Sequence, residues 1–164
     1  MTIMAEKDYY EPIKREFEKL FRVKGESYLE ITAGKRFTNK LKEEIPSNRN
    51  IIYTFLKKAP PDITGFLRTD FGARFIVIEI KDAEMGLDHI FQARKYAVLF
   101  DARYTFLVST HEIPVEVKEL SKITSILREL PFYGRLTLVQ FDRVVGSFVD
   151  WYEENPFMQD HYWR

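Results

Sequence analysis

The stretch PDITGFLRTDFGARFIVIEIK, residues 61–81, decides the fold because it predicts two neighbouring strands. Residues 62–69 and 73–81 are rich in β-branched and aromatic residues, and the turn signal Asp70-Phe71-Gly72 lies between them. Two such runs joined by a short turn predict an antiparallel hairpin. The second run then ends in charged residues, which a strand buried in a core does not need.

The hairpin geometry predicts that three charged side chains converge. Glu79 and Lys81 share one face of the second strand because side chains alternate along a strand. A turn centred on Phe71 or Gly72 allows a register in which Asp62 pairs with residue 81. Asp62 then lies on the face of Glu79 and Lys81, with Cβ atoms roughly 5 Å apart for the direct pair and roughly 7–8 Å apart for the diagonal pair.

Two carboxylates and a lysine at the end of a strand favour metal chemistry. Two carboxylates on a partly buried face repel each other, and their pKa values rise unless a cation neutralises them. Mg²⁺ and Mn²⁺ prefer hard oxygen ligands and commonly bind through one or two carboxylates. We therefore expect Asp62, Glu79 and the backbone carbonyl of Ile80 to be metal ligands. Lys81 would orient an attacking water or stabilise charge on phosphate oxygens.

The rest of the chain predicts one α/β domain over residues 1–164, a mixed sheet with helices on its faces. The helix over 87–100 is expected to begin with Asp88 as its N-cap and to bury Ile90, Phe91, Ala97 and Val98. The remaining expected elements are a helix from about 8 to 21, a weak strand over 27–32, helical pieces over 35–45 and 49–58, a strand over 103–110, a helix over 114–130, a strand over 135–141 and a short helix over 145–155.

Composition excludes several classes of protein. The chain has 164 residues with 45% hydrophobic and 30% charged residues, which is typical of a globular domain. It contains no cysteine, so disulfides, thiol nucleophiles and zinc-thiolate sites are excluded. No apolar run approaches the roughly 18 residues of a membrane span, and the N-terminus has no signal-peptide pattern. We expect a cytoplasmic protein without a membrane partner.

The net charge is zero, yet basic residues gather in the first third of the chain. Lys35, Arg36, Lys40 and Lys42 lie within nine residues and could contact the phosphates of a nucleic acid. The same residues could equally be the solvated face of a helix.

The charged residues of the hairpin resemble a known motif. Pro61-Asp62, a gap of 16 residues and then Glu79-Ile80-Lys81 are similar to the PD-(D/E)xK nuclease superfamily. Gln92 and Tyr96, four residues apart on the next helix, are similar to the QxxxY element of its RecB-like branch. The resemblance implies a restriction-endonuclease-like fold, with an α-β-β-β-α-β core.

The resemblance also implies a function. It predicts Mg²⁺- or Mn²⁺-dependent hydrolysis of phosphodiester bonds in DNA, and RNA is not excluded as a substrate. Asp62 and Glu79 would bind the metal, Lys81 would lie beside the water, and Gln92 and Tyr96 would take part in or support the site. Many members carry an acidic residue on the first helix, and the candidates here are Glu6, Glu11 and Glu16, of which Glu6 is favoured.

A second interpretation is a catalytically inactive nuclease fold that serves as a DNA-binding or assembly module. The aromatic residues near the C-terminus fit docking on the chain's own core, a homodimer contact or stacking on unpaired bases. These residues are Trp151, Tyr152, Phe157, Tyr162 and Trp163.

One tripeptide motif and the three histidines of the chain are interpreted as non-catalytic. Asp70-Phe71-Gly72 matches the kinase metal motif in letters, but no glycine-rich loop or H-R-D motif accompanies it, so it is a turn. His89, His111 and His161 lack metal-ligand spacing and are expected to be surface or capping residues.

Overall fold

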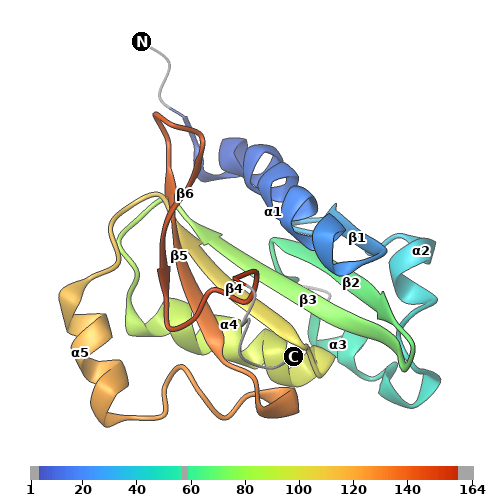
Figure 1. Cartoon of the computed structure of the whole chain (residues 1–164). Coiled ribbons are helices and arrows are strands. Elements are labelled where there is room, and N and C mark those ends of the chain that lie inside the picture. The colour runs from blue at the N-terminus through green and yellow to red at the C-terminus, as the bar shows by residue number, and fades with distance from the viewer. Residues whose placement is uncertain (1–3, 57–58, 159–164) are drawn as a thin grey trace.

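The computed structural model describes residues 4–56 and 59–158, and within these residues all strands form one six-stranded sheet in the order β1-β2-β3-β4-β5-β6 (Figure 1). The strands are β1 Ser27–Ile31, β2 Ile63–Thr69, β3 Gly72–Lys81, β4 Tyr104–Ser109, β5 Leu136–Asp142 and β6 Ser147–Tyr152. The sheet is mixed, because β3, β4 and β5 are parallel to one another and the other neighbouring pairs are antiparallel.

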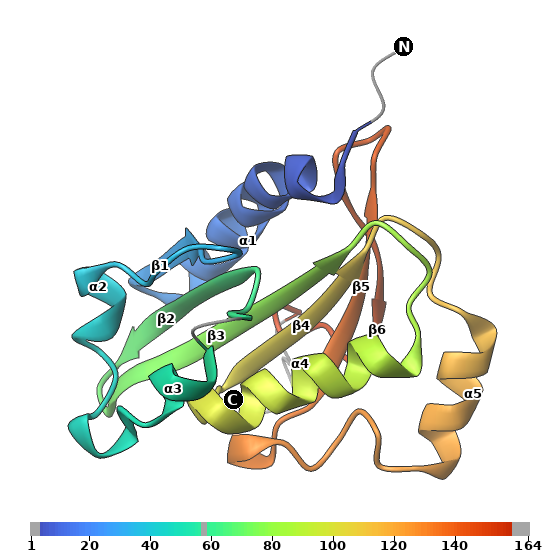
Figure 2. The ribbon, with the colours of Figure 1, turned by 180° about the vertical axis from the view of Figure 1, so that it is seen from behind.

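Helices cover both faces of this sheet (Figures 1 and 2). One face carries α1, and the other carries α4, with the short α2 and α3 beside it. The α-helices are α1 Tyr10–Lys24, α2 Asn39–Lys42, α3 Ile52–Leu56, α4 Leu87–Phe100 and α5 Val115–Ile123, and the 3₁₀ helices are η1 Glu6–Tyr9, η2 Ser47–Arg49 and η3 Pro131–Tyr133. The expected α/β sheet flanked by helices is therefore confirmed, and none of the helices in the described ranges has the length and apolar character that a membrane span requires.

The first helix packs on the hairpin as the sequence predicts. Ile13, Phe17 and Phe21 recur every four residues, so they share one helix face, and each is fully buried against the sheet. The opposite face of β3 presents Phe75 and Val77 to the core beneath α4. The alternation predicted for β3 is thus confirmed, with Ile76, Ile78 and Ile80 on the α1 face.

The hairpin is confirmed, but the predicted register is wrong. Thr69 pairs with Gly72 and Ile63 with Ile78, so the turn is the two residues 70–71 rather than a turn centred on Phe71 or Gly72. Gly72 has φ of 99°, a conformation that glycine adopts without strain. Continued by one residue, this register places Asp62 opposite residue 79 and not opposite residue 81.

The helix α4 has the predicted bounds, and its buried face matches the prediction at Ile90 and Ala97 only. Its N-cap is Gly86 rather than Asp88, which lies in the first turn and is exposed. Phe91 and Val98 are 56% and 60% exposed, contrary to expectation. The buried residues of α4 are Ile90, Ala93, Tyr96, Ala97 and Phe100.

Three other expected elements differ in length. The weak strand at 27–32 is present as β1, while the helical pieces over 35–45 and 49–58 shrink to α2 and α3, with residues 57–58 outside the described residues. The helix expected to reach residue 130 ends at Ile123. Leu127 and Leu130 are buried although they follow the helix in an irregular segment.

The predicted C-terminal helix is wrong, because residues 147–152 form β6. Phe148 pairs with Phe141 and Trp151 with Val139, and a bulge places one extra residue between these pairs. Phe148 and Trp151 therefore pack on the same core although they are three residues apart, a spacing that mimics a helix.

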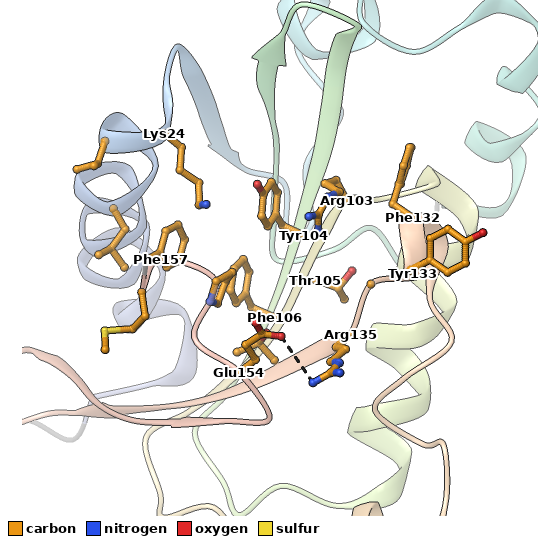
Figure 3. A pocket seen from close by; sticks show the side chains of 16 residues that line it. Lys24, Arg103, Tyr104, Thr105, Phe106, Phe132, Tyr133, Arg135, Glu154 and Phe157 are labelled. Carbon is orange, nitrogen blue, oxygen red and sulfur yellow. Dashed lines mark ion pairs between the residues drawn. The ribbon is translucent and has the colours of Figure 1, made fainter. Parts of the chain in front are cut away.

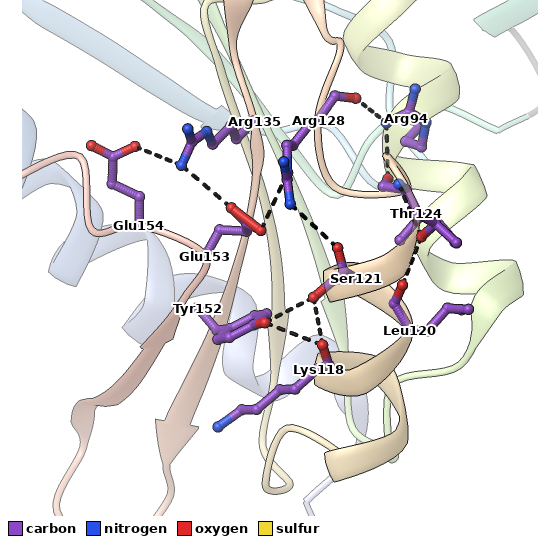
Figure 4. Close-up of polar contacts among 11 residues, drawn as sticks. Arg94, Lys118, Leu120, Ser121, Thr124, Arg128, Arg135, Tyr152, Glu153 and Glu154 are labelled. Carbon is purple, nitrogen blue, oxygen red and sulfur yellow. Dashed lines mark hydrogen bonds and ion pairs between the residues drawn. The ribbon is translucent and has the colours of Figure 1, made fainter.

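The chain's C-terminal aromatics dock on its own core, as one interpretation predicted. Trp151 and Phe157 pack against the α1 face of the sheet, whereas Tyr162 and Trp163 lie outside the described residues. The Tyr152 hydroxyl hydrogen-bonds with the Ser121 hydroxyl at 2.8 Å and donates to the Lys118 carbonyl at 3.2 Å (Figure 4). These contacts attach β6 to α5.

Candidate functional site

Asp62 and Glu79 meet at the edge of the sheet where β2 begins and β3 ends. Their residues are 9% and 2% exposed. The Asp62 N–H donates to Glu79 Oε1 at 3.0 Å, and the Ile80 N–H donates to Asp62 Oδ2 at 2.8 Å. Asp62 directly precedes β2, which begins at Ile63. The Ile80 N–H therefore bonds to the carboxylate of Asp62 and not to a backbone carbonyl of β2. The two acidic residues are thus fixed reciprocally by backbone donors.

A third carboxylate reaches this pair from the start of the chain. The Tyr10 hydroxyl lies 3.1 Å from Asp62 Oδ1 and 3.3 Å from Glu6 Oε1. The Asp82 N–H donates to Glu6 Oε2 at 3.2 Å. The segment at the start of α1 therefore covers the start of β2 and the end of β3. It brings Glu6 to the candidate site.

Burial disfavours the ionised forms of Asp62 and Glu79. Burial, and then the negative charge of Asp62, raises the pKa of Glu79 from 4.5 to about 8. Burial also raises the pKa of Asp62, against the opposing effects of the Ile80 N–H and the Lys81 charge. The Lys81 ammonium lies 3.9 Å from Glu79 Oε2. One cation accompanies three carboxylates.

Of the two helix residues of the predicted QxxxY element, Tyr96 contacts the segment that leads to Asp62, and Gln92 contacts Tyr96. Tyr96 is buried, and its hydroxyl donates to the carbonyl of Ala59, three residues before Asp62. Burial raises the pKa of Tyr96, and a hydrogen bond from Gln92 opposes this effect. The charges of Glu79 and Asp62 also raise the pKa of Tyr96, although no hydrogen bond among the described residues joins Gln92 or Tyr96 to either acid.

The donor set suits a small divalent cation. Asp62 and Glu79 offer hard carboxylate oxygens, and Mg²⁺ commonly uses one or two such ligands and otherwise keeps water. The raised pKa values of both residues show that their ionised forms are disfavoured, and a bound cation would stabilise those forms. Within residues 4–56 and 59–158, however, no group of three or more His, Cys, Asp or Glu side chains is placed to hold a metal ion. Asp62 and Glu79, with Ile80 as a predicted carbonyl ligand, remain the candidates.

Sequence reasoning missed two supports of this site. Tyr10 links two carboxylates, and the only available signal was its spacing of four from Glu6 at the start of a helix. Thr32 donates to the Pro61 carbonyl and hydrogen-bonds with Thr64 at 2.9 Å, which fixes the chain just before Asp62. Nothing in a lone buried threonine indicates such a role.

Other candidate residues lie away from the site. Glu11 and Glu16 pair with basic residues along α1. His89 Nδ1 accepts a hydrogen bond from the Gly86 N–H at 3.1 Å and so caps α4, as expected, and His111 is exposed. His161 lies outside the described residues.

The predicted basic residues form a separate surface. Lys35, Arg36 and Lys42 line a pocket of about 560 Å³ together with Pro60, two residues before Asp62. The Lys40 ammonium instead lies 4.4 Å from the centre of the Tyr28 ring. Three of the four basic residues thus face a hollow that adjoins the loop leading into the candidate site.

No protein-family model, curated protein or solved structure gives a significant match to this chain.

Proposed function

We propose that the chain is a metal-dependent nuclease of the PD-(D/E)xK type, with a restriction-endonuclease-like core and DNA as its main substrate. The observation that carries this proposal is the reciprocal bonding of Asp62 and Glu79, both almost fully buried, with Lys81 3.9 Å from the second oxygen of Glu79. The helix, three strands, helix and strand from α1 to β4 support the core assignment, with α2 and α3 as an insertion.

The chain's own residues have distinct roles in this proposal. Asp62 and Glu79 would hold Mg²⁺ or Mn²⁺, which would supply a polarised water and neutralise phosphate charge. The Ile80 N–H and the Tyr10 hydroxyl keep the Asp62 carboxylate in place. Lys81 contributes a positive charge beside Glu79, where it stabilises negative charge that develops on phosphate oxygens.

Substrate contacts are proposed for the basic surface next to the site. Lys35, Arg36 and Lys42 line the pocket that includes Pro60. Ammonium and guanidinium groups bind phosphates without regard to sequence. A nucleic acid strand that crosses this pocket would lead toward Asp62. The chemistry is the same for RNA, so the choice between DNA and RNA is an outcome of the test.

A non-catalytic nucleic-acid-binding or assembly module is the second candidate. Both carboxylate oxygens of Asp62 already accept hydrogen bonds, one from the Tyr10 hydroxyl and one from the Ile80 N–H. One oxygen of Glu79 accepts a bond from the Asp62 N–H. In addition, the described residues contain no preformed group of three metal-ligating side chains. A site closed by its own hydrogen bonds has less need of a cation than an open one.

Cleavage assays separate these two functions. We expect the wild-type chain to cut a plasmid, a single-stranded DNA or an RNA oligonucleotide in Mg²⁺ or Mn²⁺ and not in EDTA. Asp62→Asn and Glu79→Gln should each lower the rate about 100-fold or more, since each removes a proposed ligand charge. Glu84→Gln is the matched control, because Glu84 is exposed and lies in the loop after β3.

The result that contradicts the nuclease proposal is equally clear. Cleavage that persists in Asp62→Asn and Glu79→Gln at the rate of Glu84→Gln would show that the cutting activity lies elsewhere or in a contaminant. Binding of the same nucleic acids without metal-dependent cleavage would favour the non-catalytic module.

A further inference from the structure

A second pocket lies at the opposite end of the sheet from Asp62 and Glu79. It has a volume of about 550 Å³ and is formed where the end of α1, the start of β4, η3 and residues 154–158 come together (Figure 3). Because β3 and β4 are parallel, Tyr104 at this pocket pairs with Ile76, whereas Leu107 pairs with Glu79. The pocket and the candidate nuclease site therefore occupy different ends of the same strands.

Two cations at this pocket have no anionic partner in the part of the chain that the structure describes. Lys24 and Arg103 both line the pocket, and no carboxylate among the described residues lies within 4.0 Å of either side chain. Partial burial of the exposed Lys24 side chain, and then the positive charge of Arg103, lowers the pKa of Lys24. Two like charges that face one hollow, with no counterion among residues 4–56 and 59–158, define a place for an anion.

The third cation of the pocket is already neutralised. Arg135 lies 3.3 Å from a Glu153 carboxylate oxygen and 3.6 Å from one of Glu154 (Figures 3 and 4). Glu153 also pairs with Arg128 at 3.7 Å. These ion pairs fix the lower wall of the pocket in Figure 3. The positive charge available to a ligand therefore comes from Lys24 and Arg103.

Aromatic rings surround the two unpaired cations. The Lys24 ammonium lies 5.6 Å from the centre of the Tyr104 ring and 5.7 Å from that of Phe157. The Arg103 guanidinium lies 4.9 Å from the centre of the same Tyr104 ring (Figure 3). The rings hold both cations by cation–π attraction and leave the N–H donors of the cations for a ligand.

Two further aromatic residues are presented to solvent at the rim. Tyr133 is fully exposed and Phe132 is 41% exposed, and both line the pocket. Their φ angles are 56° and 62°, a left-handed conformation that non-glycine residues rarely adopt. The Arg74 guanidinium already lies 4.7 Å from the centre of the Phe132 ring, so Tyr133 provides the exposed aromatic face on which a base can stack.

We propose that this pocket binds a nucleotide through its phosphate and its base. The phosphate would bind at the two cations that flank the Tyr104 ring, Lys24 and Arg103, and the base would stack on Tyr133. A volume of about 550 Å³ is within the range of small-ligand sites. The same chemistry is present in a free mononucleotide and at the end of a nucleic acid strand. The proposal does not depend on the nuclease site, because no residue is shared between them.

Calorimetric titration in EDTA tests this pocket while preventing metal-dependent cleavage. The probes are adenosine 5′-monophosphate, ribose 5-phosphate, adenosine and a short oligonucleotide with or without a 5′-phosphate. We expect the mononucleotide to bind at least about tenfold more tightly than ribose 5-phosphate or adenosine, since each of these lacks one recognised half. Tighter binding of the phosphorylated oligonucleotide than of the mononucleotide would identify a strand end as the ligand.

Variants locate the binding. Lys24→Met and Arg103→Gln should each weaken nucleotide binding about tenfold or more, and Tyr133→Ala should weaken it without affecting ribose 5-phosphate. Arg15→Gln removes a charge on an exposed face of α1 and should leave binding unchanged. All four side chains are exposed, so unfolding by urea should confirm intact folds.

Two results would show that no phosphate binds at this pocket, and a third would reject a nucleotide as its ligand. One is the absence of binding by every phosphorylated probe, and the other is unchanged affinity in a Lys24→Met, Arg103→Gln double variant. Equal affinity for ribose 5-phosphate and the mononucleotide would exclude the base and so reject a nucleotide ligand. Asp62→Asn should bind like the wild type, which separates this result from any failure of the nuclease proposal.

Discussion

Glu79 is the residue at which core packing and charge conflict most directly. It is 2% exposed, and its one hydrogen-bond donor in the structure is the Asp62 N–H. Burial and the neighbouring carboxylate raise its pKa to about 8, so a proton or a cation is favoured there. A residue with only a structural role would be more stable as glutamine or leucine.

The raised pKa predicts how stability depends on pH in EDTA. The pKa of Glu79 in the folded protein, about 8, lies above its ordinary value of 4.5. The stabilisation that protonated Glu79 gives to the folded state is therefore complete below pH 4.5 and is lost as the pH rises through 8. The wild type should lose roughly 1–3 kcal/mol between pH 5 and pH 9 relative to Glu79→Gln. Urea unfolding of both proteins measures this difference, and parallel pH profiles would refute it.

Tyr10 is expected to stabilise the buried acids. Its hydroxyl lies 3.1 Å from Asp62 Oδ1 and is the side-chain link to Glu6. Tyr10→Phe should lower the free energy of unfolding by about 1–2 kcal/mol near neutral pH, because a buried charged acceptor loses its donor. Tyr133→Phe, at a fully exposed hydroxyl, is the control. Equal unfolding midpoints for the two variants would contradict a role for the hydroxyl.

At the scale of single residues, the sequence pattern predicted that Asp62, Glu79 and Lys81 lie together. It could not predict which hydrogen bonds these residues make. Those depend on the exact turn of the hairpin, and a shift of one or two residues in register changes each partner. Tyr10 approaches from more than 50 residues away along the chain. No local pattern encodes a contact of that range.

Among the elements, strands β1 and β2 depend on one glycine. A Cβ atom at Gly65 would lie 2.0 Å from the Tyr28 carbonyl oxygen and 2.9 Å from the Leu29 Cα atom. Gly65→Ala should therefore cost about 3 kcal/mol or more, or prevent folding, because backbone cannot move aside. Gly86→Ala meets nothing within 4 Å and should have a small effect. Thermal unfolding compares the two, and similar melting temperatures would contradict the close packing of β1 on β2.

The elements that sequence patterns predicted best are those with one dominant period. β3 alternates cleanly along 10 residues and α4 has the predicted bounds of Leu87–Phe100. The last strand was predicted as a helix because its bulge puts Phe148 and Trp151 three residues apart on one face. Tyr96, a polar aromatic, is buried in place of the expected Phe91, because Tyr96 is on the stripe of α4 that faces the sheet.

Over the whole molecule, the sheet carries two places where charge is left unbalanced. Carboxylates gather where β3 ends, and two cations that have no ion pair among the described residues, Lys24 and Arg103, lie where β4 begins. The net charge of the chain is zero, so overall composition conceals both. Such separation is a property of the fold, since the residues of each group come from distant parts of the sequence.

The central claim is that a divalent cation resolves the charge conflict of Asp62 and Glu79. Calorimetric titration of Mn²⁺ and Mg²⁺ at pH 8 into the wild type, Asp62→Asn, Glu79→Gln and the control Glu84→Gln tests it most directly, with a non-cleavable nucleic acid present to complete the coordination. We predict saturable binding in the wild type and in Glu84→Gln that is lost in the other two variants. Identical titrations for all four proteins would contradict the claim.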